Sequence, residues 1–451
     1  MILKVLLIQS YLGPKDRVLP VFPLGLAYLS QALKEHECTV LDPNIEEHPS
    51  SAIEKMIEKT KPSIIGISLR NIDVNSFSFL PYFESMLKFV KKLRPDVKIV
   101  LGGTGFSLFA EEIMGKLPEI DYGVFLEGEY SFPNLLKNLN HPQQVKGIYF
   151  RNGKKVFFTG RSQPIEFDRL PQPPRDLPGL NLNCYRQYHF SVGVQTLRGC
   201  SFSCAYCTYP YLQGRTIRLR SPKKVVDEIE HLASSYGIRE VYFADPIFNF
   251  PFDHGRSICR ELLNRKLPIN WVAYFREDSI NKQFLIEARN SGCTRFEFSP
   301  DGASQDALDV LQKGISMQDI KRTIELINEI DGINANYNFF CNTPGENLER
   351  IANFHKLLGW IKIRCRNKPP SIYLTNIRIY PHTRIHAIAR KEGLVNDGQS
   401  LLKPTFYDPP PYNLVYLPAK AVFSPTFNIH RSVGVTSLHA LACRECVKTQ
   451  I

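Results

Sequence analysis

The sequence predicts an α/β protein: a Rossmann-like, doubly wound N-terminal domain, then a partial (βα)6 barrel and a small C-terminal cap. Two observations predict this fold. Short apolar runs alternate with amphipathic segments over residues 1–140, and a second alternation of the same kind begins near residue 191. Parallel strands buried on both faces have this continuous apolar character, and the helices between them cover the sheet.

The first domain is expected over residues 1–140. Its helices are expected at 23–33, 51–59 and 79–93, and its strands at 4–9, 39–41, 63–68, 98–101 and 122–126. Open parallel sheets of this type bind ligands beyond the carboxyl ends of their strands. We therefore expect any ligand of this domain to contact the loops that follow these strands.

Residues 141–190 differ in character from the first domain. The turn pair Asn152-Gly153 between two apolar runs predicts a β-hairpin over 147–158. Four prolines lie within 171–178, which predicts an interdomain linker.

The second alternation, residues 191–391, predicts six βα units. Expected strands begin near 192 and continue at 240–243, 271–274, 294–298, 336–340 and 372–379. This length is below the ~250 residues of a full eight-stranded barrel, so a partial barrel is expected. The alternation stops near residue 392, and residues 392–451 are expected to form the cap.

The net charge and the hydropathy of the chain limit the classes of partner that it is expected to bind. The chain carries 56 Lys and Arg against 44 Asp and Glu, a net charge of +12, but it has no long basic run. Nucleic-acid sites concentrate their charge, so we expect a spread basic surface and not a nucleic-acid site. No apolar run approaches the ~20 residues of a membrane span. The N-terminus is interpreted as a strand and not a signal peptide, and a cytoplasmic protein without membrane contact is expected.

Eleven cysteines in a chain without a signal peptide indicate metal-binding, catalytic or buried thiols. Three of them, Cys200, Cys204 and Cys207, lie within one short segment after an expected strand. A structural zinc site and a 4Fe–4S cluster each have four ligands. With three protein ligands, one iron of a cluster stays open for a substrate. A zinc site with a distant fourth ligand, or three buried thiols, are the alternatives.

The C-x₃-C-x₂-C spacing after a strand resembles the radical S-adenosylmethionine (radical SAM) enzymes. The resemblance implies that Cys200, Cys204 and Cys207 bind a 4Fe–4S cluster whose open iron is chelated by SAM. It also implies that Tyr206 lies near the adenine of SAM. Cleavage of SAM by the reduced cluster then gives a 5′-deoxyadenosyl radical.

Further positions resemble the SAM site of this family. Glu297 matches an acidic position of the fourth strand, and a structural ion pair is its alternative role. Asp245 follows the second strand. It has two equally open roles, which are binding of SAM and a structural role. The turn Pro344-Gly345-Glu346 follows the fifth strand. The segment Tyr380 to Thr383 resembles a Tyr-Pro-Gly-Thr turn, but His382 replaces the glycine, so the local turn is expected to differ.

A doubly wound domain before a radical SAM domain resembles the cobalamin-binding domain of one subgroup. The resemblance implies that strand-end residues and a helix start contact cobalamin: Gly25, Ser68, Leu69, Gly102, Gly103, Glu127, Gly128 and Glu129. The loop after the first strand reads Gln9-Ser-Tyr-Leu-Gly13, without the histidine that binds cobalt in the classical domains. His36 and His48 lie outside this loop, so cobalt is expected to have no histidine ligand from this region.

The resemblance implies methylation of an unreactive carbon of a small biosynthetic intermediate or peptide, through methylcobalamin and the 5′-deoxyadenosyl radical. A reducing partner such as flavodoxin or ferredoxin is implied as well. Alternatives are a cyclase or rearrangement enzyme with the same cofactors, a tRNA-modifying enzyme, and a non-enzymatic binding module. Cys443 and Cys446 form a lone C-x-x-C, interpreted as a metal or redox pair or as incidental thiols.

Overall fold

The computed structural model describes residues 2–15, 18–74, 76–410 and 429–431. The described chain forms two compact units, one up to Val192 and one from Gly193 onward. Among the described residues, no helix combines the length and the apolar character that crossing a bilayer requires.

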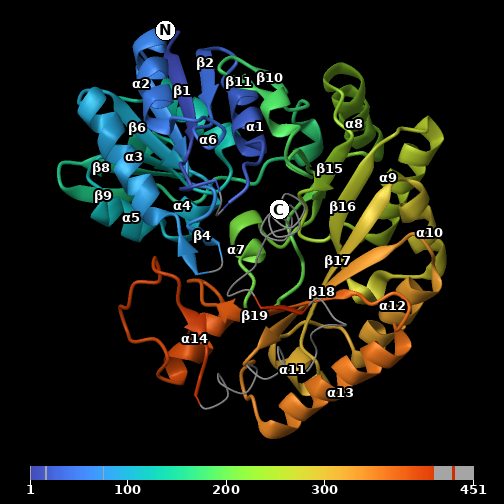
Figure 1. The fold of residues 1–451 in the computed structure, drawn as a ribbon. Helices are drawn as coiled ribbons and strands as arrows, with labels where there is room; N and C mark the ends of the chain where they lie inside the picture. Colours follow the sequence, from blue (N-terminus) through green and yellow to red (C-terminus); the bar gives the residue numbers. More distant parts are fainter. Residues whose placement is uncertain (1, 16–17, 75, 411–428, 432–451) are drawn as a thin grey trace. The chain divides into compact units, whose positions relative to one another are not determined.

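The first unit is built on a seven-stranded sheet in the order β2-β1-β3-β6-β7-β8-β9 (Figure 1). The first five strands are parallel: β1 (Lys4–Gln9), β2 (Glu37–Leu41), β3 (Ile64–Ser68), β6 (Lys98–Gly102) and β7 (Tyr122–Val124). Its helices are α1 (Leu24–Ala32), α2 (Pro49–Thr60), α3 (Leu80–Leu93), α4 (Thr104–Leu108), α5 (Ala110–Lys116) and α6 (Gly128–Lys137). Residues 5–8 of β1, which lies between β2 and β3, are at most 2% exposed. The doubly wound parallel sheet is therefore confirmed.

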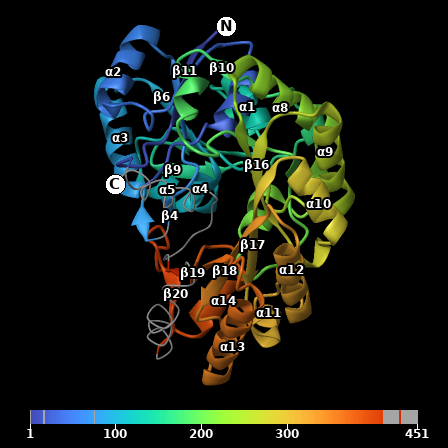
Figure 2. The same cartoon turned by 45° about the vertical axis from the view of Figure 1, so that its right-hand side comes forward.

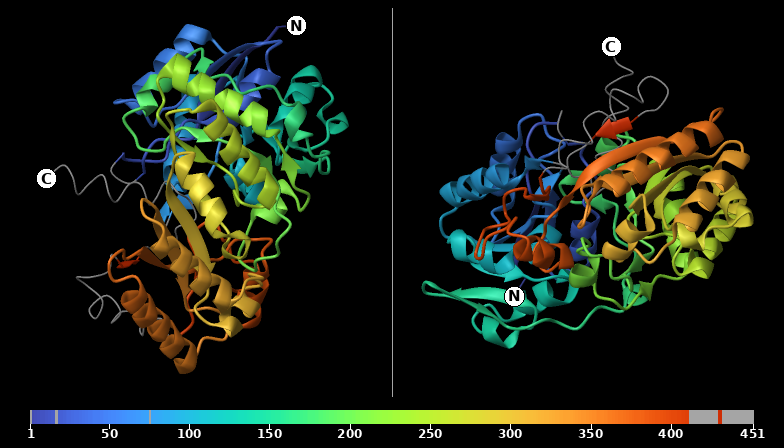
Figure 3. Two further views of the ribbon diagram at one scale, coloured as in Figure 1. Left: turned by 90° about the vertical axis from the view of Figure 1, so that its right-hand side faces the viewer. Right: turned by 90° about the horizontal axis from the view of Figure 1, so that it is seen from below.

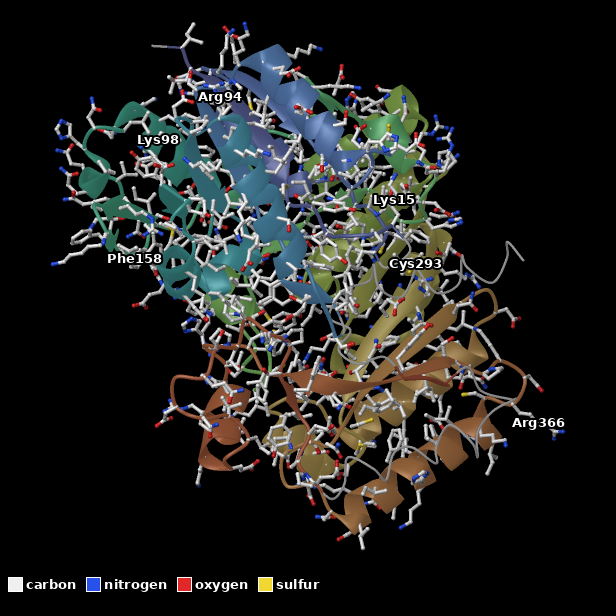
Figure 4. The ribbon with its side chains drawn as sticks, turned by 60° about the vertical axis from the view of Figure 1, so that its left-hand side comes forward. Lys15, Arg94, Lys98, Phe158, Cys293 and Arg366 are labelled. Carbon is white, nitrogen blue, oxygen red and sulfur yellow. The ribbon has the colours of Figure 1, made fainter. Side chains whose placement is uncertain are left out.

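The hairpin predicted at 147–158 consists of β8 (Ile148–Asn152) and β9 (Lys155–Phe158), both antiparallel to their neighbours. It extends the sheet of the first unit, and its free edge is seen from below in Figure 3. Its outer strand carries Phe158, which is labelled in Figure 4 and is 42% exposed. A short hairpin, β4 (Asp73–Val74) and β5 (Phe77–Ser78), follows β3.

The proline-rich segment belongs to the first unit instead of standing apart as a linker. It forms a small hairpin, β10 (Asp176–Leu177) and β11 (Leu180–Asn181). The Val40 N–H donates to the Pro178 carbonyl at 2.8 Å, and the Tyr185 hydroxyl donates to the Asp42 carboxylate at 2.5 Å. The segment therefore covers β2, an edge strand whose free N–H and C=O groups would otherwise attract other strands.

The second unit holds six parallel strands in sequence order, with β20 and β21 added beside the last one. They are β12 (Gly193–Val194), β15 (Glu240–Phe243), β16 (Asn270–Phe275), β17 (Cys293–Asp301), β18 (Asn334–Cys341) and β19 (Ser371–Arg378), followed by β20 (Phe406–Tyr407) and β21 (Ile429–Arg431). Six strands in this order confirm the partial barrel.

Helices cover one face of this sheet, as Figures 1 and 2 show. They are α8 (Pro222–Tyr236), α9 (Phe252–Arg265), α10 (Lys282–Asn290), α11 (Gln305–Val310), α12 (Met317–Glu329) and α13 (Leu348–Arg364), and two further helices are α7 (Tyr209–Gln213) and α14 (Arg384–Lys391). Aromatic side chains fill the space between sheet and helices, among them Phe275, Phe296 and Trp271.

The first strand of this unit is shorter than the sequence suggested. It ends at Val194, and a separate two-residue strand, β13 (Leu197–Arg198), pairs with β14 (Arg218–Leu219). The reason is the Asp245 carboxylate, which accepts hydrogen bonds from the backbone N–H groups of Thr196 and Leu197 at 2.8 and 3.1 Å. The Asp245 side chain thus replaces the next strand-to-strand hydrogen bonds of the sheet, and the chain leaves the sheet at this point.

Candidate functional site

Residues 200–207, here called the cysteine loop, lie between β13 and α7 at the carboxyl end of the first barrel strand. Backbone hydrogen bonds hold the loop in place. The Cys200 N–H donates to the Gly214 carbonyl at 3.0 Å, and the Ala205 N–H donates to the Leu311 carbonyl at 2.8 Å. The Ala205 carbonyl in turn accepts from the N–H of Ile385, in the first turn of α14, at 2.8 Å.

Gly199 sets the direction in which the chain enters the loop. Its φ is +95°, a conformation that side-chain-bearing residues rarely adopt. A Cβ on this residue would lie 2.1 Å from the Thr216 carbonyl oxygen. Only glycine therefore brings the chain into the cysteine loop along this path.

The three thiols are close enough to influence one another. Burial, followed by the charge of Cys204, raises the pKa of Cys207 to about 12, and burial also raises the pKa of Cys200. Within the described chain, no three Cys, His, Asp or Glu side chains are placed to hold a single metal ion. An iron–sulfur cubane holds its thiolates farther apart than one ion does, and three thiolates on one short loop are a suitable soft donor set. The donor set of the loop therefore fits an iron–sulfur cluster, and binding of the cluster by these three thiols stays a prediction.

Tyr206 connects the cysteine loop to two buried residues, Asp301 and Lys313, through a hydrogen-bonded network. Its hydroxyl contacts the Asp301 carboxylate, and the Lys313 ammonium donates to the same carboxylate at 2.6 Å and to the Tyr206 hydroxyl at 3.2 Å. Burial opposes the charge of Lys313, but Asp301 and Cys204 raise its pKa above the ordinary value. The Tyr206 ring lies edge-on to Phe340, with the centroids 4.7 Å apart.

Asp245 is buried and fully engaged by the chain segment that leads to the cysteine loop. Besides the two backbone N–H groups, it accepts a hydrogen bond from the Thr196 hydroxyl at 2.7 Å. His254 contacts the same hydroxyl at 3.2 Å. Burial raises the pKa of Asp245 to about 6, although these donors lower it. These contacts favour a role in positioning the loop, and contact with SAM stays a prediction.

Glu297 is completely buried on β17. It accepts hydrogen bonds from Arg295 Nε at 2.6 Å and from Asn336 Nδ2 on the neighbouring strand at 2.9 Å. The structural ion pair weighed for this residue is therefore present, and binding of SAM stays a prediction.

The turn after β18 contains the remaining predicted SAM contacts. The Thr343 N–H donates to the Glu346 carboxylate at 3.1 Å, which closes the turn around Pro344 and Gly345. Arg350 Nη1 donates to the Pro344 carbonyl at 2.6 Å. Glu346 thus shapes the turn, and contact of these residues with SAM stays a prediction.

His382 occupies a left-handed position with a φ of +64°, the conformation that glycine adopts most easily. Its ring stacks on Tyr211 of α7 at a centroid distance of 4.0 Å and an angle of 8°. The Thr383 hydroxyl donates to the Tyr380 carbonyl at 2.6 Å and caps α14. The tight turn therefore accommodates the histidine. The histidine ring contacts α7, the helix that follows the cysteine loop.

In the first unit, the strand register aligns the expected cobalamin-contacting positions. Ser68 is paired with Gln9 on one side and Gly102 on the other, so three strands end at the same edge. Leu69 continues beyond this edge and is buried, with its N–H bonded to the Gly102 carbonyl at 2.8 Å. Gly103 has a φ of +98°, and a Cβ there would lie 2.6 Å from the Leu69 carbonyl oxygen.

Two further chain segments reach this edge. Gly25 in the first turn of α1 is exposed, and nothing lies within 4 Å of the position that a Cβ would take. Glu127, Gly128 and Glu129 form the start of α6 and are partly exposed, and the Glu127 carboxylate accepts from the Ile165 N–H at 2.9 Å. The open space above Gly25 fits the close backbone approach that a large flat ring needs.

The loop after β1 is held by residues that we did not single out from the sequence. Asn44 donates to the Ser10 carbonyl at 3.0 Å and accepts from the Leu12 N–H at 2.8 Å. It also donates to Asp42 at 2.7 Å. His36 accepts a hydrogen bond from the Leu3 N–H at 3.4 Å, at the amino end of β1 and therefore at the opposite edge of the sheet. In the sequence, Asn44 is a small polar residue after a strand, and nothing in the sequence pattern indicated that it would bridge two loops.

The C-x-x-C cysteines, Cys443 and Cys446, lie outside the described residues.

Both halves of the chain match family models. Residues 16–136 match the B12 binding domain, and residues 194–358 match the radical SAM superfamily.

Among individual proteins, the chain is 30% identical over 335 residues to an uncharacterised methyltransferase of Pyrococcus horikoshii, with 73% of this chain and 71% of the relative covered. It is 25% identical over 349 residues to the anaerobic magnesium-protoporphyrin IX monomethyl ester cyclase of Cereibacter sphaeroides, covering 74% of this chain and 56% of the relative.

A solved structure has a similar fold. It is the radical S-adenosylmethionine methyltransferase TsrM from Kitasatospora setae with cobalamin and a [4Fe–4S] cluster bound. The TM-score is 0.75 at 21% identity, and the match covers 87% of this chain and 78% of TsrM.

Proposed function

Because the chain belongs to the radical SAM superfamily, in the group whose members also carry a B12-binding domain, we propose that it methylates an unreactive carbon of a small biosynthetic intermediate or peptide. Its cofactors are a 4Fe–4S cluster, SAM and cobalamin. When bound, the cluster supplies the electron that cleaves SAM, and cobalamin carries the methyl group.

The residues of the chain have defined tasks in this proposal. Cys200, Cys204 and Cys207 hold the cluster, and Gly199 and Asp245 fix the path of the loop that carries them. The Tyr206–Asp301–Lys313 network keeps the inner side of the loop rigid, which preserves the spacing of the thiolates. A site assembled on the ends of strands holds its reacting groups more precisely than one on mobile loops.

The edge of the first unit receives cobalamin. Gly25 leaves room for the ring, and Gly103 allows the chain to turn directly after the strand. Asn44 fixes the loop after β1, which presents Tyr11 and Leu12 in place of a histidine. The chain therefore leaves cobalt without an imidazole ligand from this loop.

One observation carries the proposal: a single chain combines a rigid three-thiol loop at the strand ends of a partial barrel with an open, glycine-lined strand edge of a B12-binding domain. The relative in Pyrococcus horikoshii, named as a methyltransferase, supports methyl transfer as the outcome.

The test is an anaerobic reaction of the reconstituted protein with dithionite, SAM carrying a trideuterated methyl group, and fractions of small metabolites and peptides as acceptors. The proposal predicts a product that gains the deuterated methyl group, together with S-adenosylhomocysteine and 5′-deoxyadenosine in similar amounts. A Cys207→Ala variant is the control and should form none of the three. Absence of SAM cleavage in the reconstituted wild type would refute the proposal.

A cyclase that uses the same cofactors is the second candidate, and the similarity to the Cereibacter sphaeroides cyclase favours it. It is distinguished by the same experiment. A cyclase would form 5′-deoxyadenosine and a product without deuterium, and no S-adenosylhomocysteine.

A further inference from the structure

Two arginines on the solvent side of the cysteine loop are attached to it through neutral groups. Arg215 Nη1 donates to the Ser203 hydroxyl at 2.9 Å. The Gln312 amide, oriented to satisfy both neighbours, donates to the Ser203 carbonyl at 3.1 Å and accepts from Arg384 Nη1 at 2.6 Å. The two arginines come from different segments, one after α7 and one at the start of α14.

Arg215 and Arg384 are both exposed. Neither Arg215 nor Arg384 forms an ion pair with any residue that the structure describes. Two other cations near the loop form ion pairs: Arg276, stacked 3.8 Å above Phe202, pairs with Asp278 at 2.9 Å, and Lys313 pairs with Asp301 at 2.6 Å. The charges of Arg215 and Arg384 are therefore placed at the surface.

The loop itself reaches solvent between these two charges. Ser201 and Ser203 are exposed, whereas Ala205 is 1% exposed and faces the protein interior. Holding the loop does not require charge at these positions, because the groups that the arginines contact are a hydroxyl and an amide. The charges are thus available to a partner that approaches the loop from solvent.

We infer that Arg215, Arg384 and the exposed serines Ser201 and Ser203 form the docking face for a small acidic one-electron carrier protein that reduces the cluster. The inference rests on the proposed function, since it presupposes a cluster on the cysteine loop. Electron transfer becomes steeply slower with distance, so a carrier must approach the loop that holds the cluster. Opposite charges raise the rate of encounter and orient the partner, and the net charge of +12 favours an acidic carrier at longer range.

The step is a simple one-electron exchange. The reduced carrier loses one electron, the cluster gains it, and no proton or leaving group is required. The carrier leaves when oxidised, which suits a small, polar and salt-sensitive interface better than a large apolar one.

The experiment measures binding of a purified flavodoxin to the immobilised, cluster-loaded full chain at several ionic strengths. Arg215→Glu/Arg384→Glu is compared with the control Lys362→Glu/Arg366→Glu. The control residues are exposed and free of ion pairs with the described chain, and Arg366 points away from the ribbon in Figure 4. Each pair of substitutions lowers the net charge from +12 to +8, since each replaces two positive charges by two negative ones.

The inference predicts at least about tenfold weaker binding and a flatter salt dependence for the first variant, and a change within about twofold for the control. Equal weakening in both variants, or none in the first, would overturn it. Preferential binding of bulk tRNA that is lost in the same variant would also overturn it, in favour of a nucleic acid. If the glutamates lower the iron content, Arg215→Gln/Arg384→Gln replaces them and retains hydrogen-bonding groups.

A second readout separates docking from chemistry. The ratio of flavodoxin-driven to dithionite-driven SAM cleavage should fall in Arg215→Glu/Arg384→Glu and stay constant in the control. Failure of dithionite-driven cleavage in the wild type would refute the proposed function, whereas the binding measurement still decides the docking face.

Discussion

Glu277 lies completely buried directly after β16, beneath the network that supports the cysteine loop. Neither of its carboxylate oxygens accepts a hydrogen bond from another described residue. The charged and titratable groups that face it are Lys313, Asp301, Arg276 and Tyr337. Burial, assisted by Asp301 and opposed by the two cations, raises the pKa of Glu277 to about 7.

This pKa makes the stability of the fold depend on pH in a defined direction. Below pH 4.5, the ordinary value, Glu277 is protonated in both the folded and the unfolded chain. Between 4.5 and about 7 the folded chain keeps a proton that the unfolded chain releases, so stability falls as the pH rises. At about 1.4 kcal/mol per pH unit, the loss above pH 7 is about 3 kcal/mol. Glu277→Gln, which is always neutral, should be more stable than the wild type by about this amount at pH 8.5 and equally stable at pH 4.5.

The assay is urea unfolding of the cluster-free protein, followed by tryptophan fluorescence. Both tryptophans, Trp271 and Trp360, lie in the second unit and report on its unfolding. The control is Glu228→Gln, since Glu228 is equally buried but pairs with Arg220 at 2.7 Å. Removing this partner leaves a buried guanidinium uncompensated and should cost about 3–5 kcal/mol. A Glu277→Gln variant that is less stable than the wild type at pH 8.5 would refute the reasoning.

Two further predictions concern glycines. Gly199→Ala should reduce the iron bound after reconstitution to less than about one quarter of the wild-type amount, while the circular dichroism spectrum stays unchanged. The reason is that the added Cβ would lie 2.1 Å from the Thr216 carbonyl oxygen. Retention of the wild-type iron content would contradict this prediction. Gly25→Leu should weaken cobalamin binding at least about tenfold, measured by absorbance titration, while stability is unchanged or about 1 kcal/mol higher from the better helix propensity. Gly115→Leu is the matched control, since Gly115 is also an exposed helical glycine with open space above it, and cobalamin affinity should not change there. Equal affinity in both variants would argue against a corrin above Gly25.

The architecture was largely predictable because buried parallel strands leave a clear pattern. The strands Lys4–Gln9 and Glu240–Phe243 have the expected bounds. The first barrel strand was not predictable, because it ends where Asp245, some 50 residues later in the sequence, binds its next backbone groups. Hydrophobic periodicity contains no information about such a long-range hydrogen bond.

The candidate site was predictable only where spacing within one segment signals the chemistry. Cys200, Cys204 and Cys207 are such a case. Asp301 and Lys313 were missed because they meet Tyr206 only in the folded chain, about a hundred residues away along the sequence. The proline-rich segment was misleading for a related reason, since proline indicates an irregular chain but does not show that it packs on the edge of β2.

The central claim is that one chain holds a cluster on the cysteine loop and cobalamin on the first unit. The most direct measurement is the iron, sulfide and cobalamin content per chain after anaerobic reconstitution. It compares the wild type with Cys200→Ala/Cys204→Ala/Cys207→Ala and with a control, Cys38→Ala/Cys184→Ala, whose thiols lie in the first unit.

The account predicts about four irons and about one cobalamin in the wild type and in the control. The triple variant should lose its iron and keep its cobalamin, because the two cofactors belong to separate compact units. Four irons without cobalamin in the wild type, or iron retained by the triple variant, would contradict the account.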